Sequence, residues 1–186
     1  MNDVLVIGDS WASAIVAGEG DGGWPLMLGL RSDMRQAVAG STAAQWAADW
    51  GGRLTRAVNT PAKTVIVSLL GNDAFAAMAD AMVTPQEVAD GAAALRRVVE
   101  AVRKERTIVL LYADPFCGRH WDAAVACPLL NLAIRSTLPE GVETFDTRKI
   151  LGESHFDGRD IHPNRAGHEA IAEALRAVLT CTGRES

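Results

Sequence analysis

The stretch VLVIGDS, residues 4 to 10, decides the fold of this chain. Its first four residues form an apolar run that is too short for a helix, so they predict a buried strand. A segment with helical potential, Trp11 to Ala17, follows Ser10. In open α/β sheets, ligands bind where a parallel strand ends and a helix begins, and a helix N-terminus offers N–H groups to an anion. The pattern therefore predicts that the Ser10 hydroxyl lies at a ligand-binding edge.

Short apolar runs rich in β-branched residues recur along the chain and alternate with helical patterns. The further predicted strands are Arg35–Val38, Thr64–Leu69, Thr107–Tyr112 and Val142–Phe145. Helix signals between and after them are a start at Thr42 to Gln45 ended by Gly51-Gly52, a capping box at Thr84-Pro85-Gln86-Glu87, the segment Trp121 to Leu138, and the apolar face Ile171, Leu175, Val178 and Leu179. Pro128 predicts a kink or a late start in the third of these. Strict alternation predicts a three-layer α/β/α sandwich around a five-stranded parallel sheet, a flavodoxin-like α/β fold.

Bulk composition limits the classes of partner and compartment. The 186 residues are 48% hydrophobic, which predicts one domain over residues 1–180 and a tail over residues 181–186. The net charge is −5, and scattered Lys and Arg residues argue against nucleic acid or membrane insertion. The chain has an odd number of cysteines, Cys117, Cys127 and Cys181, and they lack the spacing of metal ligands. This predicts reduced thiols and a cytoplasmic protein, with a Cys117–Cys127 disulfide as the alternative.

The loops after the first three predicted strands carry polar groups that would meet at one edge of the sheet. They read Gly8-Asp9-Ser10, Gly40-Ser41-Thr42 and Gly71-Asn72-Asp73, and His162 precedes the last helix. This set suits acyl transfer, with Ser10 as nucleophile and His162 as general base. The predicted donors for the oxyanion are the backbone N–H groups of Ser10 and Gly40 and the side-chain amide of Asn72.

These blocks resemble those of the SGNH hydrolases, also called GDSL-type esterases and lipases. Gly8-Asp9-Ser10 matches the first block, the segment from Val38 to Thr42 the second, Gly71-Asn72-Asp73 the third, and His162-Pro163-Asn164 with Gly167-His168 the fifth. The resemblance spans nearly the whole chain, with the blocks in family order and at family spacing. It implies the same flavodoxin-like sandwich and the hydrolysis of carboxylic esters.

The chain departs from the family pattern at three positions. Trp11 replaces the usual leucine after the nucleophile, and we expect it to line the substrate pocket. Leu70 stands two residues before Asn72, where the family usually has glycine. Arg159 stands three residues before His162, where the family usually has the aspartate that orients the histidine. We expect Asp160 to take that role, while Asp157 or a backbone carbonyl remains an alternative.

The sequence thus predicts a serine hydrolase that cleaves esters, or thioesters, of small acyl groups through an acyl-Ser10 intermediate, without metal or other cofactor. The residues from His155 to His162 could hold a divalent ion, but a role as the base for Ser10 accounts better for His162. The alternative from another class is a non-catalytic binder of an acylated carbohydrate or another small ligand on the same fold. The expected partner is a small-molecule ester.

Overall fold

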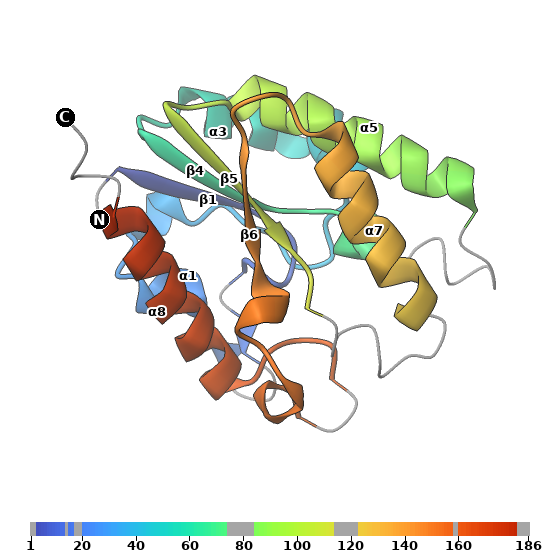
Figure 1. Ribbon diagram of the computed structural model, residues 1–186. Helices are drawn as coiled ribbons and strands as arrows, with labels where there is room; N and C mark the ends of the chain where they lie inside the picture. The colour runs from blue at the N-terminus through green and yellow to red at the C-terminus, as the bar shows by residue number, and fades with distance from the viewer. Residues whose placement is uncertain are drawn as a thin grey trace.

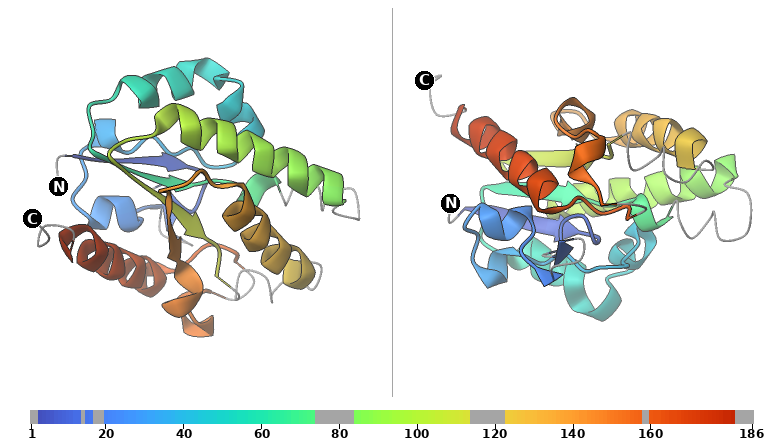
Figure 2. Two further views of the ribbon diagram at one scale, coloured as in Figure 1. Left: turned by 45° about the horizontal axis from the view of Figure 1, so that its top comes forward. Right: turned by 90° about the horizontal axis from the view of Figure 1, so that it is seen from below.

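The computed structural model of the chain describes residues 3–13, 15–16, 20–73, 84–113, 123–157 and 160–181. Its main sheet has four parallel strands in the order β1-β4-β5-β6. They are β1 (Val4–Gly8), β4 (Thr64–Ser68), β5 (Arg106–Leu111) and β6 (Glu143–Asp146). The right-hand view of Figure 2 shows them in this order, from blue β1 through green β4 and yellow β5 to orange β6.

The fifth predicted strand, Arg35–Val38, is present only as an edge segment beside β1. One parallel bridge joins Val6 to Arg35. The N–H groups of Gln36 and Val38 donate to the carbonyls of Val6 and Gly8 at 2.9 and 2.8 Å. These contacts place the segment where a flavodoxin-like order requires it, but the ladder is too short to count as a strand. The main sheet therefore has four strands rather than the five expected from the sequence.

The two groups of helices cover opposite faces of the sheet. Helices α1 (Trp24–Met27) and α8 (Arg165–Cys181) lie together on one face, and α3 (Arg53–Asn59), α5 (Pro85–Val102) and α7 (Ala123–Thr137) lie on the other (Figure 1). Helix α2 (Ala43–Ala47) packs against α5. The α/β fold with a parallel sheet between helical layers is as the sequence predicted. Among the described helices, none has the length and apolar character needed to cross a membrane.

Local sequence signals fix several helix ends. At Thr84 both halves of the predicted capping box form, since its side chain accepts from the Glu87 N–H and the Glu87 carboxylate accepts from the Thr84 N–H. Thr42 and Gln45 cap α2 in the same way. Pro128 lies within α7, which is one continuous helix in the part of the chain described. The sequence did not predict α3, which begins directly after Gly52.

The core runs through the centre of the sheet. All five residues of β1 are buried, as are the last four of β4 and the last five of β5. Such continuous burial is expected for parallel strands covered on both faces. Helix α5 contributes a buried stripe that includes Leu95, Val98, Val99 and Val102. Tight packing around β1 and β4 gives the loops at their ends a rigid base.

Remaining short elements lie mostly in the loops. They are β2 (Ile15–Val16), β3 (Gly20–Asp21) and the 3-10 helices η1 (Ser32–Met34), η2 (Trp50–Gly52), η3 (Thr147–Lys149) and η4 (Glu153–His155). Strands β2 and β3 pair antiparallel with each other.

Candidate active site

Ser10 lies in a tight turn directly after β1. Gly8 has φ of +153°, and a Cβ there would lie 2.2 Å from the carbonyl oxygen of Ser68 in β4. Only glycine allows this approach. The carbonyl of Asp9 then accepts from the N–H groups of Ala12 and Ser13 at 3.2 and 2.9 Å. The helix predicted from Trp11 to Ala17 is therefore wrong: the described residues form turns and β2, so no helix dipole acts on Ser10.

The Asp9 side chain helps to hold this turn. Its Oδ1 accepts from the Trp11 N–H at 3.0 Å, which closes the turn from the side chain. The Tyr112 hydroxyl donates to the other carboxyl oxygen and accepts from the Gly71 N–H at 2.9 Å. Burial raises the pKa of Asp9 to about 7, although the hydrogen bonds from Tyr112 and Trp11 act in the opposite direction. Burial also raises the pKa of Tyr112.

The two glycine-containing loops after Val38 and Leu69 are tied to each other. Asn72 Nδ2 donates to the Ser41 carbonyl at 3.0 Å, and Asp73 accepts from the Ala43 N–H at 2.8 Å. Ser41 Oγ in turn donates to the Gly8 carbonyl at 3.0 Å. The structure thus brings the loop of Asn72 and the loop of Gly40 together beside the end of β1. A side-chain amide carries two N–H donors, so the bond to Ser41 orients Asn72 and leaves a second donor.

Leu70 has a backbone conformation that is unusual for a residue with a side chain. Its φ is +109°, in the region that glycine adopts readily and that strains a residue with a Cβ. The side chain is buried and lies against Gly91 of α5, where an added Cβ would approach Leu70 Cδ1 to 3.0 Å. The loop therefore adopts a turn that glycine favours and fills the space beside α5 with an apolar side chain.

His162 is held by the carboxylate of Asp160. Asp160 Oδ1 lies 2.7 Å from His162 Nδ1 and accepts from the His162 N–H at 2.9 Å. Burial raises the pKa of Asp160, but the hydrogen bonds from His162 outweigh it, and the pKa lies below its ordinary value. Asp157 instead accepts from Asn164 Nδ2 at 3.0 Å. Arg159 lies outside the described residues.

Trp11 connects the serine loop to the histidine loop. Its Nε1 donates to the Ile161 carbonyl at 3.2 Å, so the residue after Ser10 is bonded to the residue before His162. The indole is 2% exposed and packs edge-on against Tyr112 and beside Phe156. The ring is therefore enclosed in the described structure, and the expectation that Trp11 lines the substrate pocket stays a prediction.

A second hydrogen-bonded chain supports the same place from α8. The Trp24 indole donates to the Trp11 carbonyl at 2.7 Å, and the Trp24 N–H donates to His168 Nδ1 at 3.2 Å. His168 is fully buried. Sequence reasoning missed both Tyr112 and Trp24, because their partners lie far away in the chain.

These contacts give one edge of the sheet a defined chemical character. The half-buried Ser10 follows β1. The His162 imidazole, whose Nδ1 contacts the Asp160 carboxylate, lies on the loop to which Trp11 is hydrogen-bonded, and the oriented Asn72 amide lies on the neighbouring loop. A carboxylate on Nδ1 fixes the tautomer with a basic Nε2. Such a set can activate a hydroxyl and donate hydrogen bonds to an oxyanion.

Comparison with solved structures finds close agreement in fold. An acetylxylan esterase from Geobacillus stearothermophilus superposes with a TM-score of 0.70 at 16% identity, covering 95% of this chain and 93% of that one. An alpha/beta hydrolase enzyme from the metagenome of Lake Arreo, Spain, superposes with a TM-score of 0.71 at 23% identity, covering 96% and 94%. No curated protein sequence matches the chain significantly.

Family comparison extends over most of the sequence. The model of the GDSL-like lipase/acylhydrolase family matches residues 6–170, which include all the motif blocks named above. The chain belongs to the GDSL-like lipase/acylhydrolase family.

Proposed function

We propose that this protein is a serine esterase in which Ser10 attacks the carbonyl carbon of a small acyl ester. His162 takes the Ser10 proton as the new bond forms and returns it to the departing alcohol. Water then attacks the acyl-Ser10 ester with His162 again as base, releasing the acid and free Ser10. Membership of an acylhydrolase family supports ester hydrolysis in general.

One observation carries the assignment of residues. The hydrogen bond from Trp11 to the Ile161 carbonyl joins the immediate neighbours of Ser10 and His162, which are 152 positions apart. The contact between Asp160 and His162 supports Asp160 as the orienting carboxylate. Asn72 and the N–H groups of Gly40 and Ser10 are the proposed oxyanion donors, each expected to lower the barrier by about 2.7–4 kcal/mol.

Substrate and compartment form the less specific part of the proposal. An acetyl ester is the first substrate to test, because a solved structure of the same fold is an acetylxylan esterase. A cytoplasmic location is supported by Cys181, which is exposed and unpaired. We treat residues 1–180 as a single catalytic domain.

Hydrolysis of p-nitrophenyl acetate by wild type and by Ser10→Ala tests the nucleophile. We expect the variant to lose about 10⁴-fold or more in kcat, as removal of an activated nucleophile does elsewhere. Ser136→Ala is the matched control, since Ser136 is exposed on α7 and bonds only within its own helix. Equal rates for folded wild type and Ser10→Ala would refute the proposal.

A covalent probe separates an enzyme from a binder on the same fold. A fluorophosphonate should add to Ser10 in the wild type and in Ser136→Ala but not in Ser10→Ala, as measured by intact mass. A protein that only binds acylated carbohydrate would not form the adduct. Binding of xylooligosaccharide acetate without labelling or turnover would favour that alternative.

Replacing each nearby carboxylate in turn tests which one orients the histidine. Asp160→Asn should lower kcat by about 10⁴-fold, because the amide can hold the wrong tautomer of His162. Asp157→Asn keeps an oxygen for Asn164 and should leave the rate nearly unchanged. The opposite ranking would assign the role to Asp157, and two active variants would leave His162 to a backbone carbonyl.

A further inference from the structure

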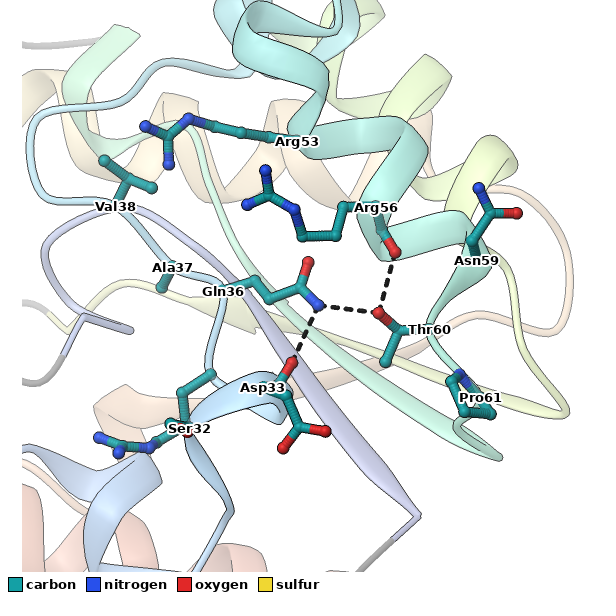
Figure 3. Close-up of a pocket in the computed structure, with 11 residues that line it drawn as sticks. Ser32, Asp33, Gln36, Ala37, Val38, Arg53, Arg56, Asn59, Thr60 and Pro61 are labelled. Atoms are coloured by element: carbon teal, nitrogen blue, oxygen red, sulfur yellow. Dashed lines mark hydrogen bonds between the residues drawn. The ribbon is translucent and has the colours of Figure 1, made fainter.

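A pocket of about 670 Å³ lies between residues 32–38 and the helix α3 with the turn that follows it. We call it the arginine pocket. Its volume is in the range typical of small-molecule sites. It is lined by Ser32, Asp33, Arg35, Gln36, Ala37, Val38, Arg53, Arg56, Asn59, Thr60 and Pro61. Figure 3 shows Arg53 and Arg56 extending from α3 above Gln36, Ala37 and Val38.

Positive charge gathers in this pocket although the chain as a whole carries −5. Arg53 and Arg56 are three residues apart on α3, a spacing at which like charges repel, and Arg35 of the edge segment beside β1 is a further lining residue. The one acidic lining residue, Asp33, is already bonded to Arg31 at 2.6 Å. The arginines of the pocket have no carboxylate partner within the described part of the chain.

Three polar atoms of residues that line this pocket are buried and lack a hydrogen-bond partner among the described residues. They are the Nε atoms of Arg35 and Arg53 and the Oε1 of Gln36. Leaving such groups unpaired away from water costs free energy, so a ligand that pairs with them would recover part of that cost. The two Nε–H groups require an acceptor, and the Gln36 oxygen requires a donor.

The polar groups are also fixed in position before any ligand arrives. Gln36 Nε2 donates to Thr60 Oγ1 at 2.8 Å and to the Asp33 carbonyl at 2.9 Å, which turns Oε1 away from both (Figure 3). The guanidinium carbon of Arg53 stacks 4.5 Å from the centre of the Trp50 ring. Such restraint lowers the entropy lost on binding.

We propose that the arginine pocket binds an oxyanion that carries a neighbouring hydroxyl, as a sugar phosphate or a sugar acid does. The anionic oxygens accept from the guanidinium groups of Arg53 and Arg56, and the hydroxyl donates to Gln36 Oε1. Guanidinium groups suit this task because they offer parallel N–H bonds to phosphate and carboxylate.

This binding site goes beyond the proposed esterase function and does not depend on it. The pocket reaches toward the catalytic edge only at Val38, whose carbonyl accepts from Ser41 Oγ at 2.8 Å. None of its arginines belongs to the set assigned to ester hydrolysis. A binding measurement therefore tests the pocket even if the esterase assignment fails.

Calorimetric titration of the full chain with glucose 6-phosphate, glucuronic acid and glucose tests the proposal. At least one anionic sugar should bind, with an affinity that falls as NaCl is added, and glucose should not. The double variant Arg53→Gln, Arg56→Gln should weaken binding by about tenfold or more. Arg97→Gln is the matched control, because it removes one arginine charge at an exposed position of α5 that does not line the pocket.

Each outcome decides the matter. Binding of the phosphate alone, of the acid alone or of both identifies the oxyanion accepted. Failure of both anions to bind, equal binding of glucose, or unchanged affinity in the folded double variant would overturn the site. If the double variant does not fold, Arg56→Gln alone takes its place, since this side chain is exposed and should still weaken binding.

Discussion

The carboxyl group of Asp9 and the phenol of Tyr112 share a buried hydrogen bond, although 103 positions separate the two residues. Asp9 precedes Ser10, and the Tyr112 hydroxyl also accepts from the N–H of Gly71, which precedes Asn72. A single contact thus joins the turn of the proposed nucleophile, the loop of the proposed oxyanion donor and the end of β5. Because Asp9 is only 1% exposed, its ionisation is coupled to the stability of the whole edge.

Substituting Asp9→Asn should remove a pH-dependent part of the stability. The pKa of Asp9 is about 7 in the fold against an ordinary value of 3.8, so the folded state keeps this proton where the unfolded state loses it. The stabilisation that this proton gives to the folded state is fully present below about pH 3.8 and is lost as the pH rises to about 7. The change in the free energy of unfolding is on the order of 4 kcal/mol. Relative to Asp9→Asn, the wild type should therefore lose free energy of unfolding between pH 4 and 7.

Urea denaturation at several pH values measures this difference. Asp3→Asn serves as the control, because Asp3 is exposed at the start of the described chain. Its difference from wild type should show no comparable change over the same range. Parallel stability curves for wild type and Asp9→Asn would contradict the coupling.

Trp11→Phe tests whether the indole positions the histidine loop. Phenylalanine keeps the apolar contacts with Tyr112 and Phe156 but cannot donate to the Ile161 carbonyl. We expect a loss of about 1–2 kcal/mol in stability and a fall in kcat with little change in KM, because substrate contacts stay intact while His162 loses its alignment. Steady-state kinetics on p-nitrophenyl acetate give the split.

The exposed tryptophan Trp50 provides the control for that substitution. Trp50→Phe keeps an aromatic ring beside Arg53 and makes no contact with the histidine loop in the described structure. It should leave kcat unchanged. An effect of Trp11→Phe on KM alone would instead support Trp11 as a residue of the substrate pocket.

Patterns local in sequence predicted the fold well. Apolar runs located all four strands of the main sheet, and Thr84 with Glu87 marked the start of α5. The edge segment Arg35–Val38 lies where a strand was expected, but it has a partner only on the side of β1 and forms a single bridge. Two consecutive glycines, Gly51 and Gly52, indicated a helix end without showing that another helix begins there.

Contacts between distant residues account for what the sequence alone could not show. The turn that stands in place of the helix expected after Ser10 is held by the Asp9 side chain, which accepts from the Trp11 N–H, and Asp9 is itself bonded to the distant Tyr112. In the same way, the burial of Trp11 depends on the distant Ile161 carbonyl. Propensity describes neighbours in the chain, whereas these choices are made by tertiary partners.

Leu70 provides a test of backbone strain in the loop before Asn72. Alanine is normally more stable than glycine, but at φ of +109° the Cβ of alanine is strained. We therefore expect the free energy of unfolding of Leu70→Gly to exceed that of Leu70→Ala by about 1–2 kcal/mol, measured by urea denaturation. Both should be less stable than the wild type, since loss of a buried leucine costs about 2–5 kcal/mol, more than the strain relieved. The usual order, with alanine above glycine, would show that the turn relaxes.

Gly167 in the first turn of α8 gives a test of how closely the helix supports the histidine loop. A Cβ at this position would lie 2.8 Å from the His155 carbonyl oxygen and 2.9 Å from Pro163 Cβ. That carbonyl accepts from the Asn164 N–H at 2.8 Å, so Gly167→Ala should displace the segment that carries His162. We expect a loss of about 1–3 kcal/mol in stability together with a fall in kcat.

Gly152→Ala is the matched control for this change, since it lies in the same stretch of loop. Its backbone is extended, with φ of −124°, and an added Cβ meets nothing within 4 Å. Stability and kcat should therefore stay close to those of the wild type. Thermal melts and p-nitrophenyl acetate kinetics on the pair distinguish a general effect of alanine in the loop from steric pressure on His162. If Gly167→Ala melts like Gly152→Ala and keeps full activity, α8 does not fix the histidine.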